Sequence, residues 1–182
     1  ASLFAGTGVS VAMANAEGAK SGERDFRAVF GSAEVLSKHH CRVFWSTPQA
    51  AVIDASLVGE WMALDALVEI AEGAYLSRPG LFAWDRIDPA SALLVEHLPA
   101  NLAGKGADLG AGYGYLSAEI LSRSTQVTAL DLYEAEARAL ALARQNLSTF
   151  EAQATLVYRW HDVTAGVSEQ YDFIVSNPPF HT

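Results

Sequence analysis

A glycine-rich stretch in the second half of the chain has the residue types and spacing of a ligand-binding loop. The sequence ADLGAGYGYLS at residues 107–117 places Asp108 at the end of a predicted strand, and a predicted helix begins at Tyr115. Three glycines follow the acid at two-residue steps: Gly110, Gly112 and Gly114. Glycines allow the backbone to turn sharply and approach a ligand closely, while the helix presents free N–H groups. The alternative for this stretch alone is a tight strand–helix corner that binds nothing.

The glycine spacing separates two classes of cofactor. A dinucleotide fingerprint reads G-x-G-x-x-G, because a pyrophosphate must rest on the helix that follows. This loop reads G-x-G-x-G and follows Asp108, and a carboxylate there favours a cationic ligand and repels a pyrophosphate. The spacing therefore disfavours a nicotinamide oxidoreductase.

Two more acids lie at or just after the ends of predicted strands. Asp131 in TALDLYE occupies the place where α/β nucleotide folds use a carboxylate to accept hydrogen bonds from both ribose hydroxyls. Its alternative role is to cap the helix that begins near Glu134. Asp162 in YRWHD could accept a hydrogen bond from an exocyclic adenine amine, or could be solvated.

The last predicted strand runs into Asn177, Pro178, Pro179 and Phe180. Prolines restrict the backbone, so that the neighbouring carbonyls point in a set direction. Because the strand ends in register with the three earlier strand ends, we expect this segment to lie beside the glycine loop. The alternative is an ordinary strand that a proline terminates.

Strands and helices alternate regularly in the second half of the chain. Strands are expected at 106–109, 126–132, 155–160 and 171–176, and helices at 115–123 and 134–147. This order is typical of a doubly wound, mainly parallel α/β sheet, in which ligands bind at the carboxyl ends of the strands.

The first part of the chain is expected to form a strand–helix–strand unit that is a piece of a parallel sheet. Strands are expected at 9–14 and 41–46. Between them, Phe26, Val29 and Phe30 form the apolar stripe of a helix that Gly31 can end. Residues 47–70 fit both a helix and a strand, and we expect them to connect the two units.

Composition limits the partners and the compartment. The net charge of -9 disfavours broad electrostatic binding to a nucleic-acid backbone. No apolar run is long enough to span a bilayer and no signal peptide is evident, which predicts a cytoplasmic protein without a membrane partner. The single cysteine, Cys41, excludes an internal disulfide. No metal is expected at His39, His40 and Cys41, because adjacent strand residues point to opposite faces.

The combination of these motifs resembles the S-adenosylmethionine-dependent methyltransferases that modify planar exocyclic nitrogen. NPPFH at 177–181, RPGLFAWDRIDPAS at 78–91, and NAEGAKS with SKHHCRVF at 15–21 and 37–44 resemble the small-subunit ribosomal RNA guanine-2-amino methyltransferase family. The resemblance covers nearly the whole chain. It implies S-adenosylmethionine as cofactor, and ribosomal RNA or the small ribosomal subunit as partner.

The resemblance also implies roles for individual residues. The Asn177 side-chain oxygen and the Pro178 carbonyl would accept hydrogen bonds from the guanine amine, and Phe180 would stack on the base. Phe82 and the WDRID stretch at 84–88 would close over the cofactor or the base, although Phe82 could equally be a core aromatic. No individual role is assigned to Arg86 or Asp88.

The family consists of two methyltransferase-like domains in tandem, the first degenerate and without cofactor. Its pattern implies that residues 1–50 are a remnant of the degenerate domain, 51–76 a connector, and 77–182 the start of a catalytic domain of class I methyltransferase type. The chain then lacks the start of the first domain and everything after the fourth strand of the second, as a fragment would.

Two other functions stay open. A similar Asn-Pro-Pro-aromatic segment serves methyltransferases that act on adenine 6-amino groups or on protein glutamine amides, and the acidic composition suits a protein substrate. A scaffold that binds RNA or a partner without catalysis would fit the missing strands.

Overall fold

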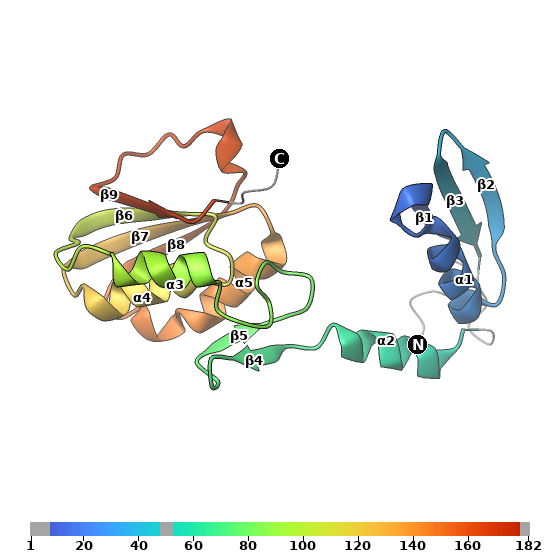
Figure 1. The fold of residues 1–182 in the computed structure, drawn as a ribbon, viewed down its shortest axis with the longest axis horizontal. Helices are drawn as coiled ribbons and strands as arrows, with labels where there is room; N and C mark the ends of the chain where they lie inside the picture. The colour runs from blue at the N-terminus through green and yellow to red at the C-terminus, as the bar shows by residue number, and fades with distance from the viewer. Residues whose placement is uncertain (1–7, 48–52, 179–182) are drawn as a thin grey trace. The chain divides into compact units, whose positions relative to one another are not determined.

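The computed structural model describes residues 8–47 and 53–178 and divides the chain into two units, Ala1–Asp65 and Ala66–Thr182 (Figure 1). The division falls within the stretch 51–76 that was expected to connect two domains. Within the described stretches, no helix combines the length and the apolar character that a membrane crossing requires.

The N-terminal unit contains a three-stranded antiparallel sheet of order β1-β3-β2. Its elements are β1 (Val9–Ala14), the short turn η1 (Asn15–Glu17), α1 (Ala19–Phe30), β2 (Glu34–Lys38), β3 (Cys41–Ser46) and α2 (Ala55–Leu64). The expectation that the N-terminal unit is a piece of a parallel sheet is therefore wrong. Strand β2, which the sequence analysis missed, enters between α1 and β3 and pairs antiparallel with β3.

A tight hairpin turn explains this correction. His39 and His40 connect β2 to β3 with φ angles of 52° and 59°, the left-handed conformation that a two-residue hairpin loop requires at both positions. Both histidines lie in a turn and not on a strand. The expectation that they point to opposite faces of a strand, and so cannot share a metal, therefore does not hold for them. Among the described residues, no group of three or more His, Cys, Asp or Glu side chains could hold a metal ion.

Helix α1 packs on the antiparallel sheet through the apolar stripe expected from the sequence. Phe26 and Val29 are buried, and the Phe26 ring lies edge-on to Phe44 with centroids 5.2 Å apart. Gly31 follows the helix with φ of 77°. In the stretch that fitted both a helix and a strand, α2 is helical and begins after Asp54, whose side chain caps it.

The C-terminal unit is a parallel four-stranded sheet of order β8-β7-β6-β9. Its strands are β6 (Gly104–Leu109), β7 (Val127–Glu134), β8 (Thr155–Trp160) and β9 (Phe173–Ser176), and its helices are α3 (Pro89–Glu96), α4 (Tyr115–Arg123) and α5 (Ala137–Asn146). Short turns η3 (Ser148–Phe150) and η4 (Val163–Ala165) join the later elements. The expected α/β fold with a mainly parallel sheet is confirmed.

One hydrophobic core joins the three helices to the sheet. Val95 of α3, Ile120 of α4 and Ala143 of α5 belong to the same buried cluster as Leu130 and Leu132 of β7. All three helices lie on the same side of the sheet (Figure 1). The core therefore holds the carboxyl ends of the strands and the start of α4 in a defined arrangement.

An antiparallel hairpin, β4 (Val68–Ile70) with β5 (Tyr75–Ser77), precedes this sheet. It was not anticipated, because each strand has only three residues. The Asn146 side chain attaches it to the rest of the unit: Oδ1 accepts from the Leu76 N–H at 2.8 Å, and Nδ2 donates to the carbonyls of Leu76 and Tyr113 at 3.0 and 2.8 Å.

Candidate functional site

The glycine loop turns at the carboxyl end of β6 and is bound to the end of β7. Its three glycines all have positive φ: 78° at Gly110, 56° at Gly112 and 93° at Gly114. Residues with a side chain rarely adopt this conformation, which explains the glycine at each position. The N–H groups of Gly110 and Ala111 both donate to the Tyr133 carbonyl, at 2.9 and 3.0 Å.

Asp108 is completely buried immediately before this loop. Its Oδ2 accepts a hydrogen bond from Ser117 Oγ at 2.7 Å, whereas its buried Oδ1 has no hydrogen-bond partner among the described residues. Burial raises the pKa of Asp108 to about 6, because removal from water disfavours the charged form. A buried carboxylate oxygen without a donor fits a ligand that brings a positive charge or an N–H group.

The structure corrects the position of Asp131. Strand β7 continues three residues beyond it to Glu134, and Asp131 is only 1% exposed, in register with Ala107 and Val157 on the flanking strands. Its Oδ2 accepts hydrogen bonds from Arg159 Nε at 2.9 Å and Tyr171 Oη at 2.8 Å. Asp131 is therefore not at the strand end, and it does not cap α5, whose N-cap is Glu136.

Glu134 occupies the strand end that the sequence analysis assigned to Asp131. Its Oε2 accepts a hydrogen bond from the Gly112 N–H at 2.7 Å, and its Oε1 accepts one from the Glu136 N–H at 2.8 Å. These two bonds orient the carboxylate beside the glycine loop. The available signal was its position just before the Ala-rich helix, but the sequence analysis interpreted Glu134 as part of that helix.

Asn177 follows the last residue of β9 and is bound to the start of α3. Its Nδ2 donates to Asp88 Oδ2 at 2.9 Å and to Ser91 Oγ at 2.8 Å. Asp88 is the N-cap of α3, because the same Oδ2 also accepts from the Ser91 N–H at 2.8 Å. Sequence reasoning assigned no role to these two α3 residues, although Asp-Pro before an apolar stretch is a helix-start signal.

A small pocket of about 50 Å³ brings these groups together. It is lined by Phe82, Ala83, Asp88, Ser91, Gly110, Ala111, Gly112, Tyr113, Tyr115, Leu116 and Asn177. Four of the residues singled out from the sequence therefore meet here: Phe82, Gly110, Gly112 and Asn177. Phe82 is 65% exposed, so it covers the pocket from the solvent side and is not a core aromatic.

The other expected site residues lie outside the pocket lining. Asp162 caps the short turn η4, and its Oδ1 accepts from the Thr164 N–H at 2.9 Å and from Thr164 Oγ1 at 2.8 Å. These hydrogen bonds lower the pKa of Asp162 below its ordinary value. Pro178 is exposed at the end of the described chain, and Phe180 lies outside the described residues.

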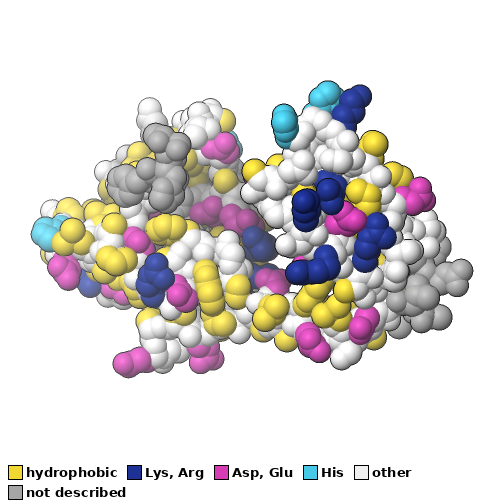
Figure 2. All heavy atoms as spheres, turned by 45° about the vertical axis from the view of Figure 1, so that its right-hand side comes forward, with side chains coloured by type: hydrophobic (Ala, Val, Ile, Leu, Met, Phe, Trp, Pro, Cys, Tyr) yellow, Lys and Arg dark blue, Asp and Glu magenta, His cyan; other side chains and the backbone are white. Residues whose placement is uncertain are grey.

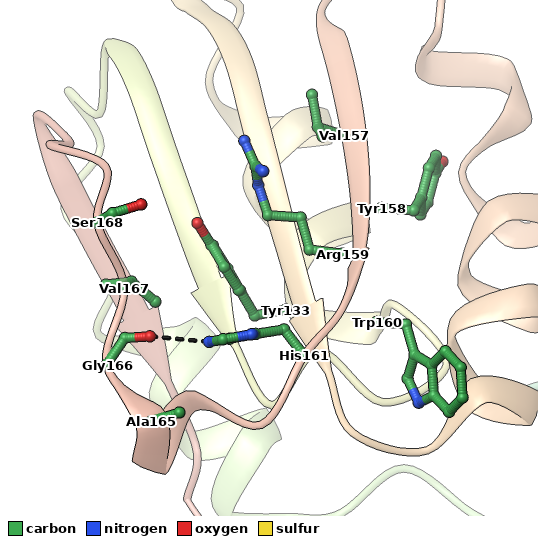
Figure 3. A pocket seen from close by; sticks show the side chains of 10 residues that line it. All are labelled: Tyr133, Val157, Tyr158, Arg159, Trp160, His161, Ala165, Gly166, Val167 and Ser168. Carbon is green, nitrogen blue, oxygen red and sulfur yellow. Dashed lines mark hydrogen bonds between the residues drawn. The ribbon is translucent and has the colours of Figure 1, made fainter.

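A wider hollow of about 750 Å³ lies along β8 and residues 165–168 (Figure 3). Arg159 and His161 point to one side of the strand, and Trp160 to the other. Two of the polar groups that line the hollow are already bonded: Arg159 to Asp131, and His161 Nε2 to the Gly166 carbonyl at 2.8 Å. The smaller pocket, which combines an oriented amide with a glycine loop, is therefore the better candidate for chemistry.

Basic side chains are present on the N-terminal unit, and Figure 2 shows Lys and Arg on its visible face, at the right. Ion pairs compensate several of them: Arg27 and Arg42 both pair with Glu23, and Arg24 pairs with Asp25. Because a phosphate backbone needs uncompensated positive charge, these three arginines offer limited electrostatic attraction for RNA.

The strand order β8-β7-β6-β9, with the glycine loop after β6, is that of a Rossmann-like α/β fold, the fold class to which the class I S-adenosylmethionine-dependent methyltransferases belong. A family profile described as methyltransferase small domain matches residues 72–182, and the chain belongs to this family. The resemblance to methyltransferases that the sequence motifs indicated is thereby confirmed.

The alignments with two named relatives cover most or all of the chain. The chain is 34% identical over 187 residues to a ribosomal RNA small subunit methyltransferase C from Chromohalobacter salexigens, covering 100% of this chain and 53% of the relative. A protein of the same name from Pseudomonas entomophila is 33% identical over 156 residues, covering 84% and 46%. The chain thus spans about half the length of the curated relatives it matches.

A solved structure shares the fold. It is a 16S ribosomal RNA N2 methyltransferase from T. thermophilus in complex with AdoMet and guanosine, with a TM-score of 0.69 and 23% identity, covering 97% of this chain and 48% of that one. At this identity the likeness supports the fold of the chain.

Proposed function

We propose that the protein transfers a methyl group from S-adenosylmethionine to the exocyclic 2-amino group of a guanine in small-subunit ribosomal RNA, in the cytoplasm. The observation that carries the proposal is the pocket in which the Asn177 amide, Phe82 and the glycine loop meet. The names of the relatives, and the AdoMet and guanosine bound to the T. thermophilus enzyme, support the choice of cofactor and base.

The same proposal extends to the domains. Residues 1–50 are the remnant of a degenerate methyltransferase-like domain, 51–76 connect it, and 77–182 begin the catalytic domain. The pocket residues and the family match at 72–182 all belong to the last of these stretches or directly border it. The partner is ribosomal RNA, as free RNA or within the small subunit.

The cofactor residues follow the geometry of the loop. Gly110, Gly112 and Gly114 allow the backbone to approach the ligand, and Asp108 provides a buried negative charge next to them. Glu134 takes the ribose-binding role that the sequence analysis gave to Asp131. Its two oxygens are already oriented by backbone N–H groups, and each carboxylate oxygen can accept a second hydrogen bond, here from a ribose hydroxyl.

Two more residues complete the cofactor site. Asp162 Oδ2 has no partner among the described residues, so this oxygen can accept a hydrogen bond from the adenine amine. Phe82 covers the pocket where the cofactor and the base meet. Bound S-adenosylmethionine supplies an electrophilic methyl group on a sulfonium sulfur, and the sulfur keeps the electron pair when the methyl group leaves.

The chain then makes the guanine amine a better nucleophile. The nitrogen lone pair is delocalised into the ring, so the planar amine is unreactive. Asn177 Oδ1 and the Pro178 carbonyl accept its N–H groups, which favours a tetrahedral nitrogen and aims the lone pair at the methyl carbon. Phe180 stacks on the base, which must leave any duplex to reach the pocket. The methylated nitrogen finally loses a proton to solvent.

Methyl transfer from tritiated S-adenosylmethionine tests this proposal. Small ribosomal subunits and naked small-subunit RNA are the substrates, and the modified nucleoside is identified by mass spectrometry. The enzyme is the 182-residue chain, in parallel with the same chain carried on through any residues that its gene encodes after Thr182. We expect N2-methylguanosine. Label in N6-methyladenosine or in a protein glutamine would replace the substrate assignment.

Calorimetric titration separates the cofactor from the reaction. We expect S-adenosylmethionine to bind and NAD not to bind, because of the spacing of the glycine loop. If neither length of chain binds S-adenosylmethionine, the enzyme proposal is wrong, and a scaffold without catalysis becomes the better reading.

A further inference from the structure

The Asn177 amide is held by two acceptors that come from one turn of α3. Its Nδ2 is 2.9 Å from Asp88 Oδ2 and 2.8 Å from Ser91 Oγ. No donor among the described residues is bonded to its Oδ1. The anchoring residues lie almost 90 positions earlier in the chain, with sequence separations of 89 and 86, so the contact exists only because β9 and α3 meet in the fold.

The chemistry of these partners determines which way the amide faces. An ionised carboxylate only accepts hydrogen bonds, so the amide nitrogen and not the oxygen must face Asp88. Turning the amide over would place Oδ1 against the carboxylate and lose that bond, whereas the Ser91 hydroxyl can donate as well as accept and does not select an orientation. The orientation therefore follows from the identity of the neighbours, and it directs the acceptor oxygen away from α3.

The start of α3 is itself rigid. Asp88 caps the helix through the Ser91 N–H, and Pro89 at the first helical position has its backbone φ preset. Ser91 is 8% exposed and Val95, one turn further on, is in the core. A group bonded to both Asp88 and Ser91 is thus attached to the packed part of the unit.

We propose that Asp88 and Ser91 are positioning residues that clamp the Asn177 amide, so that its Oδ1 is the atom presented to the substrate. The substrate-presenting part of this inference rests on the proposed function. The clamp makes the presented group an acceptor only, so the site selects a substrate that directs an N–H or O–H donor at Asn177 Oδ1 and disfavours one that directs a hydrogen-bond acceptor at this atom.

The expected effect on catalysis follows from counting conformers. Without the clamp, the Asn177 side chain can occupy about three χ1 wells with two amide orientations each, or about six states, of which one is productive. If the productive fraction falls to about one-sixth, kcat falls roughly five- to tenfold, while the affinity for S-adenosylmethionine is unchanged.

Three variants separate the clamp from the helix cap. Asp88→Ser keeps a good N-cap but is too short to reach Asn177, and Ser91→Ala removes the second acceptor while the backbone cap bond remains. Asp88→Asn keeps an acceptor oxygen at the same distance from the backbone, so its kcat should stay within about threefold of the wild-type value. Glu96→Ser, at the exposed far end of α3, is the matched control and should change nothing.

Two readouts are measured, the first on both chain lengths and the second on the chain length that transfers a methyl group. The first is solvent exchange of the Asn177 side-chain NH2, observed by nuclear magnetic resonance and assigned by its loss in Asn177→Ala; it needs neither cofactor nor RNA. We expect exchange to be at least tenfold faster in the Asp88→Ser/Ser91→Ala double variant. The second is kcat, expected to fall five- to tenfold in that variant at an unchanged KM for S-adenosylmethionine.

The outcomes distinguish this inference from the function on which it rests. Equal exchange in the wild type and the double variant would overturn the clamp, whatever the activity. A loosened amide with wild-type kcat would overturn its positioning role. A slow-exchanging amide in a wild-type protein that transfers no methyl group would refute the proposed function and the substrate-presenting role, and would leave only the clamp itself. Urea unfolding midpoints identify any variant that fails to fold.

Discussion

Exchanging the charge of Glu134 for a neutral amide should weaken S-adenosylmethionine binding. Glu134→Gln keeps the shape of the side chain but replaces one acceptor oxygen by an NH2 group and makes the remaining bonds neutral. A hydrogen bond to a charged group contributes about 1.5–3 kcal/mol and a neutral one about 1 kcal/mol. For two ribose hydroxyls the expected loss is about 1.5–3 kcal/mol, which corresponds to binding about ten- to a hundredfold weaker.

The matched variant is Asp131→Asn, which removes a charge three residues earlier on the same strand. Asp131 is 1% exposed and paired with Arg159 Nη2 at 2.7 Å. Breaking a buried pair costs about 3–5 kcal/mol, but the Arg159 side chain is 34% exposed, so water compensates part of the loss. We expect the free energy of unfolding to fall by about 2 kcal/mol, with no change in the cofactor affinity of the folded protein.

Isothermal titration of S-adenosylmethionine and urea unfolding, applied to both variants, measure the two effects separately. The prediction is a crossed result: much weaker binding with the smaller loss of stability for Glu134→Gln, in which one backbone N–H loses its acceptor, and the larger loss of stability with normal binding for Asp131→Asn. A tenfold loss of affinity in folded Asp131→Asn, with wild-type affinity in Glu134→Gln, would refute the assignment of the ribose site to the strand end.

Three further variants test the loop, the sheet and the amide. Burial raises the pKa of Asp108 to about 6, so the folded state holds a proton that the unfolded state has lost, and the free energy of unfolding falls as the pH rises from about 4 to 6. The difference in the free energy of unfolding between Asp108→Asn and the wild type should therefore shift by about 2–3 kcal/mol in favour of the variant between pH 4 and a pH above 6. A difference that does not depend on pH would contradict this. In Gly106→Ala the new Cβ would meet the Phe173 ring, which predicts that the free energy of unfolding falls by about 2 kcal/mol or more. A second substitution, Phe173→Ala, should offset part of this loss. Purely additive losses in the double variant would exclude the clash. Asn177→Ala should abolish methyl transfer and leave S-adenosylmethionine binding intact, and near-wild-type turnover would rule out the role of its amide.

Motifs that set local backbone geometry could be predicted well from the sequence. The alternation of strands and helices in the second half, and the positive φ at Gly110, Gly112 and Gly114, follow from residue type and order. Asn177 could be placed beside the glycine loop because parallel strands end at one edge of a sheet. These expectations needed no knowledge of which side chains touch.

The exact pairing of elements could not be predicted in the same way. Strand β2 was missed because two histidines, and not a typical Asn-Gly pair, form its hairpin turn. Asp131 was placed at a strand end because it is the first acid after an apolar run, whereas β7 extends three residues past Asp131: Leu132 and Tyr133 pair with both β6 and β8, and Glu134 pairs with β8. Hydrogen bonds to neighbouring strands, and not local propensity, decide where that strand ends.

By itself the sequence determined the class of fold and the chemical types at the site: a buried acid, a flexible glycine turn and an amide at the end of the last strand. Only the tertiary structure decided which acid lies beside the loop and which way the amide faces. The physical reason is that dihedral preferences act only within a few residues along the chain. The hydrogen bond between Asn177 and Asp88 joins groups 89 residues apart, which meet only after the sheet and α3 have packed.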